Sequence, residues 1–237
     1  MTTVAILPVK RFERAKQRLH PGLGGEDRSQ LAEAMVGDVL HALARTRGIA
    51  QVLVVTAEPR AAALANRAGA EVIPDQHEHG QSEAVGLGLV RALADGHTRA
   101  LLVPGDCPAL ESRQVEQLLG FAGTQAGPEE TEEGSAEPAP RQVAIVPDRH
   151  GTGTNALLLE PPDVIVPAFG PGSFARHVER ATAAGALWRV ARPDSLLLDV
   201  DTGEDLDTLR AALLEREDAA PRTRAVLARL TAGARPS

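Results

Sequence analysis

The chain has 237 residues, and its 32 acidic against 25 basic side chains give a formal net charge of −7. This balance argues against a broad nucleic-acid-binding face, and the single cysteine, Cys107, excludes an internal disulfide framework or a cysteine-rich metal site. No apolar run approaches the roughly 18 residues that span a membrane, and a strand pattern begins directly after Met-Thr-Thr. We therefore expect a cytoplasmic protein without a signal peptide that binds neither nucleic acid nor membrane.

The core is expected to consist of aliphatic residues, because hydrophobic residues make up 43% of the chain and aromatic residues only 2%. Short, nearly continuous apolar runs are typical of strands buried on both faces, and they predict strands over 4–9, 52–56, 100–105, 143–148, 155–160 and 195–200. Helical spacing, such as the four-residue steps of Leu31, Met35, Val39 and Leu43, predicts helices over 26–46, 58–67, 81–95, 111–120, 173–184 and 203–215.

This alternation of strands and helices predicts a single α/β domain over residues 1–218, with a mostly parallel central sheet flanked by helices. Two segments fall outside the pattern. Residues 122–142 are rich in Glu, Pro, Gly and Ala without an apolar period, which indicates a mobile surface loop. Residues 219–237 predict a C-terminal helical tail with a frayed end.

Charged side chains follow several predicted strands, where ligands of open α/β sheets bind. The stretch "PVKRFERAKQRL" after the first strand carries Lys10, Arg11, Lys16 and Arg18, and Asp106 follows the strand at 100–105. Two plainer interpretations stay open. The basic residues can form a solvated helix face, and Asp106 can start a turn or cap the helix at 111.

A pair of carboxylates, Asp199 and Asp201, follows the last predicted strand in "LLLDVDTGEDL". Side chains two residues apart on an extended segment share a face, so these two repel each other unless a cation lies between them or one is protonated. Mg²⁺ suits such a pair because it prefers oxygen ligands. Thr202 and Asp205 instead match a helix capping box, so Asp205 is left out of the predicted site.

Small polar residues form two further candidate loops. In "DRHGTGTNALLL" the glycines Gly151 and Gly153 allow close backbone approach and Thr154 offers a hydroxyl, although an ordinary glycine-rich turn explains the same letters. In "FGPGSFARH" the residue Ser173 is suited to cap the next helix, whose N-terminus also favours anions. His177 and Arg176 receive no role here, and Cys107 is interpreted as a small buried residue rather than a nucleophile.

Basic residues at one strand end, acids at two others and Gly, Thr and Ser loops between them make up a phosphate-plus-metal site. Phosphoryl or nucleotidyl transfer requires these parts: cations that hold phosphates, a metal that neutralises charge, and groups that position the reactants.

Five segments together resemble one known family: "ILPVKRFERAKQRL", "VPGDCPAL", "PDRHGTGTNALLL", "FGPGSFARH" and "LLLDVDTGEDL". They occur in order from about residue 4 to residue 210 and resemble the phosphoenolpyruvate or 2-phospho-L-lactate guanylyltransferases of coenzyme F-420 biosynthesis. The resemblance implies a GT-A-like nucleotidyltransferase fold. It also implies transfer of GMP from GTP to a phosphorylated three-carbon acid with release of diphosphate, and a possible hand-over of the product to the next enzyme of the pathway.

The resemblance also assigns residues by matching motifs. It implies that Mg²⁺, or Mn²⁺, is held by Asp106, Asp199 and Asp201. It places Lys10, Lys16 and Gly105 at the nucleotide, with Lys16 and Asp106 as catalytic residues. The acceptor pocket is matched by Thr154, Gly170 and Ser173. In one departure, Gln81 and Ser82 stand where the family tends to show a Leu-Asn pair near the nucleotide.

Two other functions are compatible with a phosphate-binding α/β fold. Another nucleotidyltransferase of this fold, such as a molybdenum-cofactor guanylyltransferase or a sugar-phosphate enzyme, usually carries a glycine-rich loop with an Arg after the first strand, and "LPVKRFERAKQRL" has no glycine. A non-catalytic nucleotide-binding module has no need of acids at two separate strand ends. No motif in the sequence distinguishes phosphoenolpyruvate, 2-phospho-L-lactate and 3-phosphoglycerate as acceptors. The Ala- and Arg-rich composition suggests a high-GC bacterial source and on that ground favours phosphoenolpyruvate.

Overall fold

A computed structural model describes residues 2–14, 16, 19, 23–121 and 141–233. In these residues the central sheet has seven strands in the order β3-β2-β1-β4-β6-β5-β7. All are parallel except β6, which runs antiparallel to both of its neighbours, β4 and β5. The predicted α/β fold with a mostly parallel sheet is confirmed. The strands are β1 Thr3–Val9, β2 Ile49–Thr56, β3 Glu71–Pro74, β4 Arg99–Leu102, β5 Gln142–Pro147, β6 Thr154–Glu160 and β7 Leu187–Val190.

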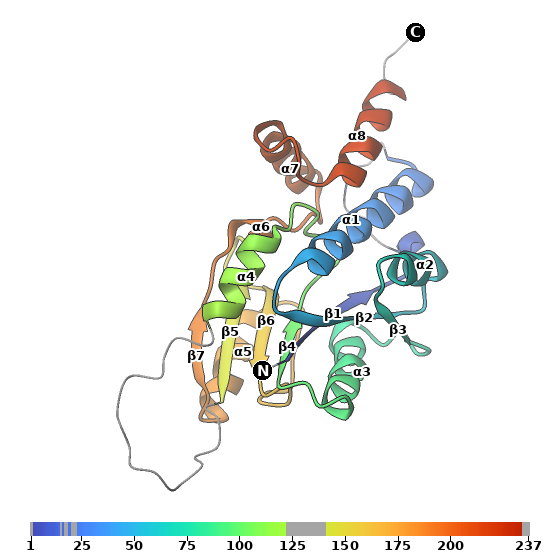
Figure 1. Cartoon of the computed structure of the whole chain (residues 1–237). Coiled ribbons are helices and arrows are strands. Elements are labelled where there is room, and N and C mark those ends of the chain that lie inside the picture. The colour runs from blue at the N-terminus through green and yellow to red at the C-terminus, as the bar shows by residue number, and fades with distance from the viewer. Residues whose placement is uncertain (1, 15, 17–18, 20–22, 122–140, 234–237) are drawn as a thin grey trace, which may run out of the picture.

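Helices cover both faces of the sheet, as Figure 1 shows. Along β1 the side chains of Ala5 and Leu7 join a core with helices α1, α2, α4 and α6, whereas Val4 and Ile6 join a core with α3 and α5. This alternation explains why the strand is apolar at nearly every position. The helices are α1 Gly25–Arg45, α2 Pro59–Arg67, α3 Gln81–Ala94, α4 Ser112–Phe121, α5 Ser173–Ala183 and α6 Asp194–Leu197, with the short 3₁₀ helix η1 at Phe12–Arg14.

A third apolar cluster joins the C-terminal helices α7 (Gly203–Glu215) and α8 (Pro221–Gly233) to α1. Figure 1 shows α7 and α8 at the end of the molecule beside α1. The buried carboxylate of Asp38 on α1 accepts hydrogen bonds from the backbone N–H groups of Arg222 and Thr223, at 3.1 and 2.8 Å. These bonds satisfy donors at the start of α8 that have no partner within the helix. Within the predicted C-terminal tail 219–237, residues 221–233 form α8, which packs on the sheet-covering helix α1, and the predicted frayed end at 234–237 lies outside the described residues.

One predicted strand is wrong. Residues 195–200 form the end of the four-residue helix α6 followed by a non-sheet segment, although Leu196 and Val200 are fully buried. The apolar run "SLLLDV" reflects burial of this segment and not strand structure. A short apolar run does not distinguish a strand from other buried backbone. Two short strands, β3 and β7, were missed, because each is a four-residue edge strand whose residues are mostly not buried.

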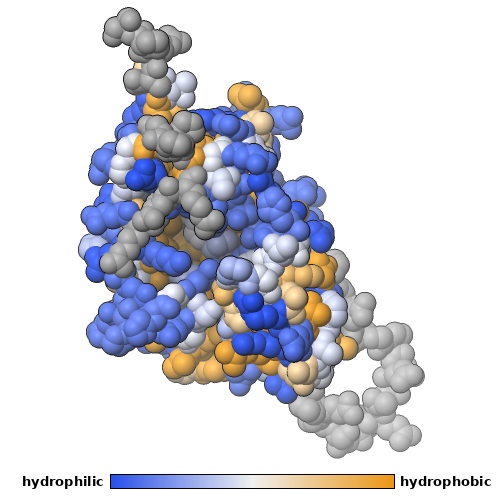
Figure 2. All heavy atoms as spheres, turned by 180° about the vertical axis from the view of Figure 1, so that it is seen from behind, coloured by the Kyte–Doolittle hydropathy of each residue, from blue (hydrophilic) through white to orange (hydrophobic). Residues whose placement is uncertain are grey.

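Most of the segment 122–142 lies outside the described residues, and Gln142 begins β5 rather than ending a loop. Figure 2 shows hydrophilic residues over much of one face of the molecule, with hydrophobic residues toward its lower part. Among the described residues, no helix combines the length and apolar character that crossing a membrane requires.

Candidate active site

The candidate site lies at one edge of the sheet, where β1 and β4 end and β6 begins. Because β6 is antiparallel to β4, its first residues lie at the same edge as the carboxyl ends of the parallel strands. A cavity of about 230 Å³ opens at this edge, between the chain that follows β1, the chain that follows β4 and the start of α3. Its lining includes Lys10, Lys16, Gly105, Asp106 and Asp201, which were all predicted as site residues.

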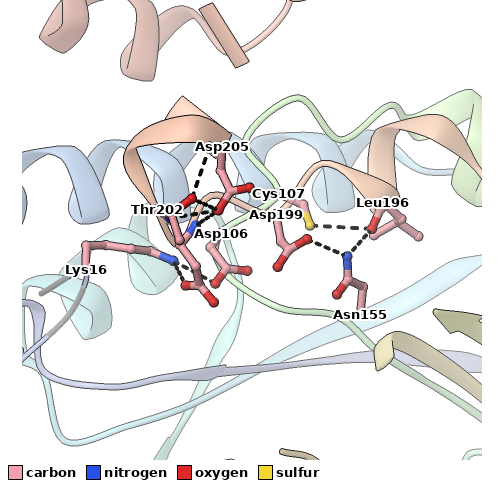
Figure 3. A network of polar contacts seen from close by, with 9 residues as sticks. Lys16, Asp106, Cys107, Asn155, Leu196, Asp199, Thr202 and Asp205 are labelled. Atoms are coloured by element: carbon pink, nitrogen blue, oxygen red, sulfur yellow. Dashed lines mark hydrogen bonds and ion pairs between the residues drawn. The ribbon is translucent and has the colours of Figure 1, made fainter. Parts of the chain in front are cut away.

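Lys16 joins two of the predicted carboxylates. Its Nζ lies 2.7 Å from Asp106 Oδ2 and 2.9 Å from Asp201 Oδ1, and only 8% of its side chain is exposed. Burial alone would lower the pKa of Lys16, but attraction to Asp106 and Asp201 outweighs it and raises that pKa above the ordinary value. Figure 3 shows Lys16 reaching toward Asp106 from the side opposite Asp199. The ammonium group is therefore held charged beside Asp106 and Asp201, which together with Asp199 are called the acidic cluster below.

Asp199 is held by a different partner. Its Oδ1 accepts a hydrogen bond of 3.0 Å from Nδ2 of the buried Asn155, which also donates to the carbonyl of Leu196. Burial raises the pKa of Asp199, and repulsion from Asp106 and Asp201 raises it further, while the hydrogen bond from Asn155 opposes the shift. Asp199 is thus a half-buried acid with no ion-pair partner among the described residues.

The donor set fits a hard cation, although the carboxylates are not gathered tightly. In the described part of the chain, no three His, Cys, Asp or Glu side chains form a group with metal-binding spacing. Asp106 Oδ1 is nevertheless buried without a hydrogen-bond partner among these residues, and the pKa of Asp199 is raised by burial and neighbouring carboxylates. Unpaired carboxylate oxygens of this kind are the ligands that Mg²⁺ prefers.

The two plainer interpretations of these charges can now be compared with the structure. Asp106 lies in the turn after β4, as one of these interpretations has it, and its Oδ2 in addition binds Lys16. The basic stretch divides: Lys10 lines the cavity, Arg11 pairs with Glu78 at 3.1 Å, and Arg18 lies outside the described residues. Gly105 packs closely against α1, since a Cβ there would lie 3.0 Å from Val36 Cγ2.

Thr154, the first residue of β6, lies against helix α5. Its Oγ1 is 2.9 Å from Nδ1 of His177, a side chain with 0% exposure. The start of α5 is tied to the same region, because the N–H of Phe174 donates to the carbonyl of Thr152 and the N–H of Ser173 donates to that of Gly170. The structure therefore brings Thr154, Gly170 and Ser173, the residues predicted to bind the acceptor acid, into one neighbourhood. None of the three lines the cavity described above.

The N-cap prediction for Ser173 is wrong. The N-cap of α5 is Gly172, with φ +70°, and Ser173 is the first helical residue. Gly170 also has a positive φ, +111°, a conformation that side chains other than glycine rarely adopt. The N–H groups of Ser173 and Phe174 already have carbonyl partners, so these two amides at the start of α5 are not available to an anion.

The glycine-rich turn at 148–153 is explained by the chain itself. Asp148 accepts hydrogen bonds from the N–H groups of Thr152 and Gly153, at 2.9 and 2.8 Å. A Cβ at Gly153 would lie 2.7 Å from Asp148 Oδ2, so the close approach is to this carboxylate. The capping box of Thr202 and Asp205 is confirmed. Cys107 is fully buried, and burial raises the pKa of its thiol, which fits a structural residue.

Comparison with known proteins identifies the family. A family model described as "Guanylyl transferase CofC like" matches residues 3–218. The chain is 46% identical over 230 residues to a phosphoenolpyruvate guanylyltransferase of Conexibacter woesei, covering 97% of both chains. It is 32% identical over 209 residues to a 2-phospho-L-lactate guanylyltransferase of Methanothermobacter thermautotrophicus, covering 87% of this chain and 83% of the relative. The protein belongs to the CofC-like guanylyltransferase family. The resemblance found from the five motifs is thereby confirmed, and the protein is a nucleotidyltransferase enzyme.

Solved structures support the fold of this CofC-like chain. A protein of Desulfovibrio desulfuricans G20, assigned as a nucleotide-diphospho-sugar transferase, superposes with a TM-score of 0.72 at 19% identity, covering 97% of this chain and 95% of the other. Glucosyl-3-phosphoglycerate synthase of Mycobacterium tuberculosis, in a complex with Mn²⁺ and UDP, superposes with a TM-score of 0.55 at 14% identity, covering 100% of this chain and 81% of the other. At these identities the likeness concerns the GT-A-like fold.

Two residues of the CofC-like site were missed from sequence. Asn155 was not singled out, although a polar residue inside the apolar run "TNALLLE" is a signal of a buried hydrogen bond. His177 was given no role because nothing in "FGPGSFARH" indicates which way its ring points. Both contacts join residues far apart in the chain, Asn155 to Asp199 and Thr154 to His177, so no local spacing predicts them.

Proposed function

We propose that the protein transfers GMP from GTP to the phosphate of phosphoenolpyruvate and releases diphosphate, in the biosynthesis of coenzyme F-420. The observation that carries the proposal is the buried Lys16 ammonium between Asp106 and Asp201 in the lining of the cavity. A fixed cation beside carboxylates suits the binding and transfer of phosphate groups. The guanylyl group and the three-carbon acceptor are inferred from the names of the relatives. Phosphoenolpyruvate is the proposed acceptor because the relative with 46% identity is a phosphoenolpyruvate guanylyltransferase.

The chemistry follows from the charge of the reactants. An oxygen of the acceptor phosphate forms a bond to the α-phosphorus of GTP, while the bond from the α-phosphorus to the bridging oxygen breaks and diphosphate leaves. A phosphomonoester has a second pKa of about 6, so at neutral pH the attacking oxygen carries charge without a general base. The barrier is then the repulsion between two polyanions. Lys16 and Lys10 reduce it by holding positive charge near the phosphates.

A divalent metal is part of this proposal. Asp106, Asp199 and Asp201 would hold Mg²⁺, or Mn²⁺, and the metal would neutralise charge on the phosphates when bound. Other side chains position these acids. Asn155 orients Asp199 through a hydrogen bond of 3.0 Å, and Lys16 offsets the charge of Asp106 and Asp201. Thr154, Gly170 and Ser173 would bind the three-carbon acid on the Asp199 side of the acidic cluster, away from Lys16.

The test is an acceptor panel with the purified protein and Mg²⁺. Diphosphate release from GTP would be measured with phosphoenolpyruvate, 2-phospho-L-lactate or 3-phosphoglycerate, and the product identified by mass spectrometry. We expect release only when GTP and an acceptor are both present, with the highest kcat/KM for phosphoenolpyruvate. Preference for 2-phospho-L-lactate would correct the acceptor but keep guanylyl transfer. Absence of release with every acceptor would overturn the proposal and favour a nucleotide-binding module.

A further inference from the structure

The ring of His177 is held by two hydrogen bonds that determine its tautomer. Nε2 lies 2.9 Å from the backbone N of Ala168, and a backbone N–H only donates, so Nε2 accepts. The other ring nitrogen, Nδ1, lies 2.9 Å from Thr154 Oγ1. In a neutral imidazole one nitrogen carries the proton and the other accepts, so the proton of His177 resides on Nδ1.

His177 is neutral at the pH of the cell. Its ring has 0% exposure, and burial lowers its pKa to about 4, helped by the positive charges of Arg180 and Arg176 on the same helix. Phe169 packs its ring edge against the imidazole with centroids 5.3 Å apart, which further restricts the orientation of the ring. A fixed neutral ring with a proton on Nδ1 can only donate to Thr154.

The Thr154 hydroxyl is consequently left as a donor. Its oxygen accepts from His177 Nδ1–H, and the structure gives it no second hydrogen-bond partner among the described residues. The hydroxyl hydrogen then points away from His177, free to meet a group that only accepts. Phosphate and carboxylate oxygens of an anionic acid are acceptors of this kind.

The same ring also fixes the loop that carries Gly170. The bond from Ala168 N to His177 anchors this loop at one end, and the N–H of Phe169 donates to Ser82 Oγ on α3 at 3.0 Å. Arg176 donates to the carbonyl of Ala168 at 3.0 Å. One buried side chain thus sets both the direction of the Thr154 hydroxyl and the position of the neighbouring loop.

We infer that His177 is a positioning residue for the acceptor: through its Nδ1–H tautomer it turns the Thr154 hydroxyl into an obligatory hydrogen-bond donor toward the anionic three-carbon acid. The inference rests on the proposed function for the identity of that acid. It assigns His177 no contact with substrate and no proton transfer, and it concerns affinity for the acceptor rather than for GTP.

Two replacements of His177 separate its two bonds. Gln places an amide near the position of Nε2, so it can keep the Ala168 bond but lose the bond to Thr154. Asn places an amide near the position of Nδ1, so it can keep the Thr154 bond but lose the bond to Ala168. For His177→Gln we expect KM for the acceptor to rise about 10-fold or more, the scale of a lost hydrogen bond to a charged group, with KM for GTP unchanged. His177→Asn is expected to restore part of the acceptor affinity.

Thr154 supplies the matched controls. Thr154→Val removes the hydroxyl and should match His177→Gln, whereas Thr154→Ser keeps a hydroxyl and should lose less acceptor affinity than Thr154→Val. If His177 acts through Thr154, adding His177→Gln to Thr154→Val should raise the acceptor KM little further. Additive losses, or equal losses for GTP and acceptor, would overturn the inference and indicate a merely structural histidine.

A measurement on the parent protein avoids dependence on variants. Two-bond ¹H–¹⁵N NMR spectra report which ring nitrogen of a histidine carries the proton, and the His177→Asn variant assigns the signal. We expect the Nδ1–H form, and an Nε2–H form would overturn the inference. If the parent transfers GMP to no acceptor, the proposed function fails; an Nδ1–H ring together with an unchanged acceptor KM in His177→Gln refutes the inference while guanylyl transfer stands.

Discussion

The backbone N–H of Val200 donates a hydrogen bond of 3.0 Å to the backbone carbonyl of Asp106. This bond ties the segment that carries Asp199 and Asp201 to the turn after β4, although the two lie far apart in the chain. Val200 and Cys107 are both fully buried, so the connection is anchored in the core. The acidic cluster is therefore assembled by the main chain, and it does not depend on a ligand to bring its two halves together.

The first prediction concerns removal of metal. Because Asp106 Oδ1 has no partner among the described residues and burial raises the pKa of Asp199, a divalent cation should bind these acids. We expect excess EDTA to abolish guanylyl transfer and added Mg²⁺ or Mn²⁺ to restore it, measured by diphosphate release. Calorimetric titration of Mg²⁺ into the parent and into an Asp106→Asn variant gives a readout independent of turnover. Undiminished activity in excess chelator would contradict the metal site.

A second prediction concerns Lys16. Lys16→Met leaves Asp106 and Asp201 close together without their cation, so we expect the free energy of unfolding of the metal-free protein to fall by about 1–3 kcal/mol. Urea unfolding measures this loss. Lys16→Arg keeps the charge and serves as the control for stability. Guanylyl transfer should fall on the order of 100-fold in the Met variant, and a variant as stable and as active as the parent would refute the role of Lys16.

The sequence predicted the layout of the sheet well because burial on both faces makes apolar runs long and regular. It placed β1 within one residue at its start and predicted α1 almost to its ends. It failed at 195–200, where buried backbone outside the sheet carries the same letters as a strand. It also missed β3 and β7, since edge strands need not be apolar.

The candidate site was predictable in part. Strand-end position alone indicated Lys10, Lys16 and Asp106, and these do line the cavity. The prediction that Asp199 and Asp201 share a face assumed a strand over 195–200, which the structure does not contain. Their proximity to Asp106 comes instead from the backbone bond of Val200. The partners Asn155 and His177 could not be predicted, because hydrogen bonds between distant residues leave no periodic signal in the chain.

A third prediction concerns Ser173 and its hydroxyl. Ser173 is buried as the first residue of α5, and its N–H donates to the carbonyl of Gly170. Ser173→Ala and Thr154→Val should each weaken binding of the three-carbon acid by about 10-fold, with a smaller effect on GTP. Isothermal titration of each ligand tests this. Equal losses for both ligands would contradict an acceptor pocket at this place.

A fourth prediction links His177 to pH. Its folded pKa of about 4 lies below the ordinary value of about 6.5, so between these values the unfolded chain binds more protons than the folded one. The contribution of His177 to the free energy of unfolding is then complete above about pH 6.5. It is lost as the pH drops toward 4, which lowers the free energy of unfolding by on the order of 3 kcal/mol. Urea unfolding of the parent and of His177→Gln isolates this part, since the variant lacks the titrating ring.

The control for this pH dependence is His150→Gln, at an exposed position. That variant should retain the pH dependence of the parent, whereas His177→Gln should show a shallower decline between pH 6.5 and 4. Identical pH dependence in the parent and in His177→Gln would mean that the imidazole does not resist protonation, and would remove the support for a fixed neutral ring.

The last prediction separates fold from function at Asp199. Asp199→Asn keeps the shape of the side chain and an oxygen that can accept from Asn155, but removes one negative charge. Burial raises the pKa of Asp199, and Asp106 and Asp201 raise it further, so its ionised form costs the metal-free fold stability at neutral pH. The variant should therefore unfold at an equal or higher temperature than the parent when both are free of metal.

The same change should act in the opposite direction on catalysis. If Asp199 helps to hold the divalent cation, its neutralisation should lower guanylyl transfer on the order of 100-fold or more, the scale of a lost electrostatic stabiliser. Asp207→Asn, which changes an exposed acid of α7, is the matched control and should leave both the melting temperature and the rate near those of the parent. An Asp199→Asn protein that transfers GMP at the parent rate would show that this half-buried acid is structural, because relief of repulsion would then be the only consequence of the substitution.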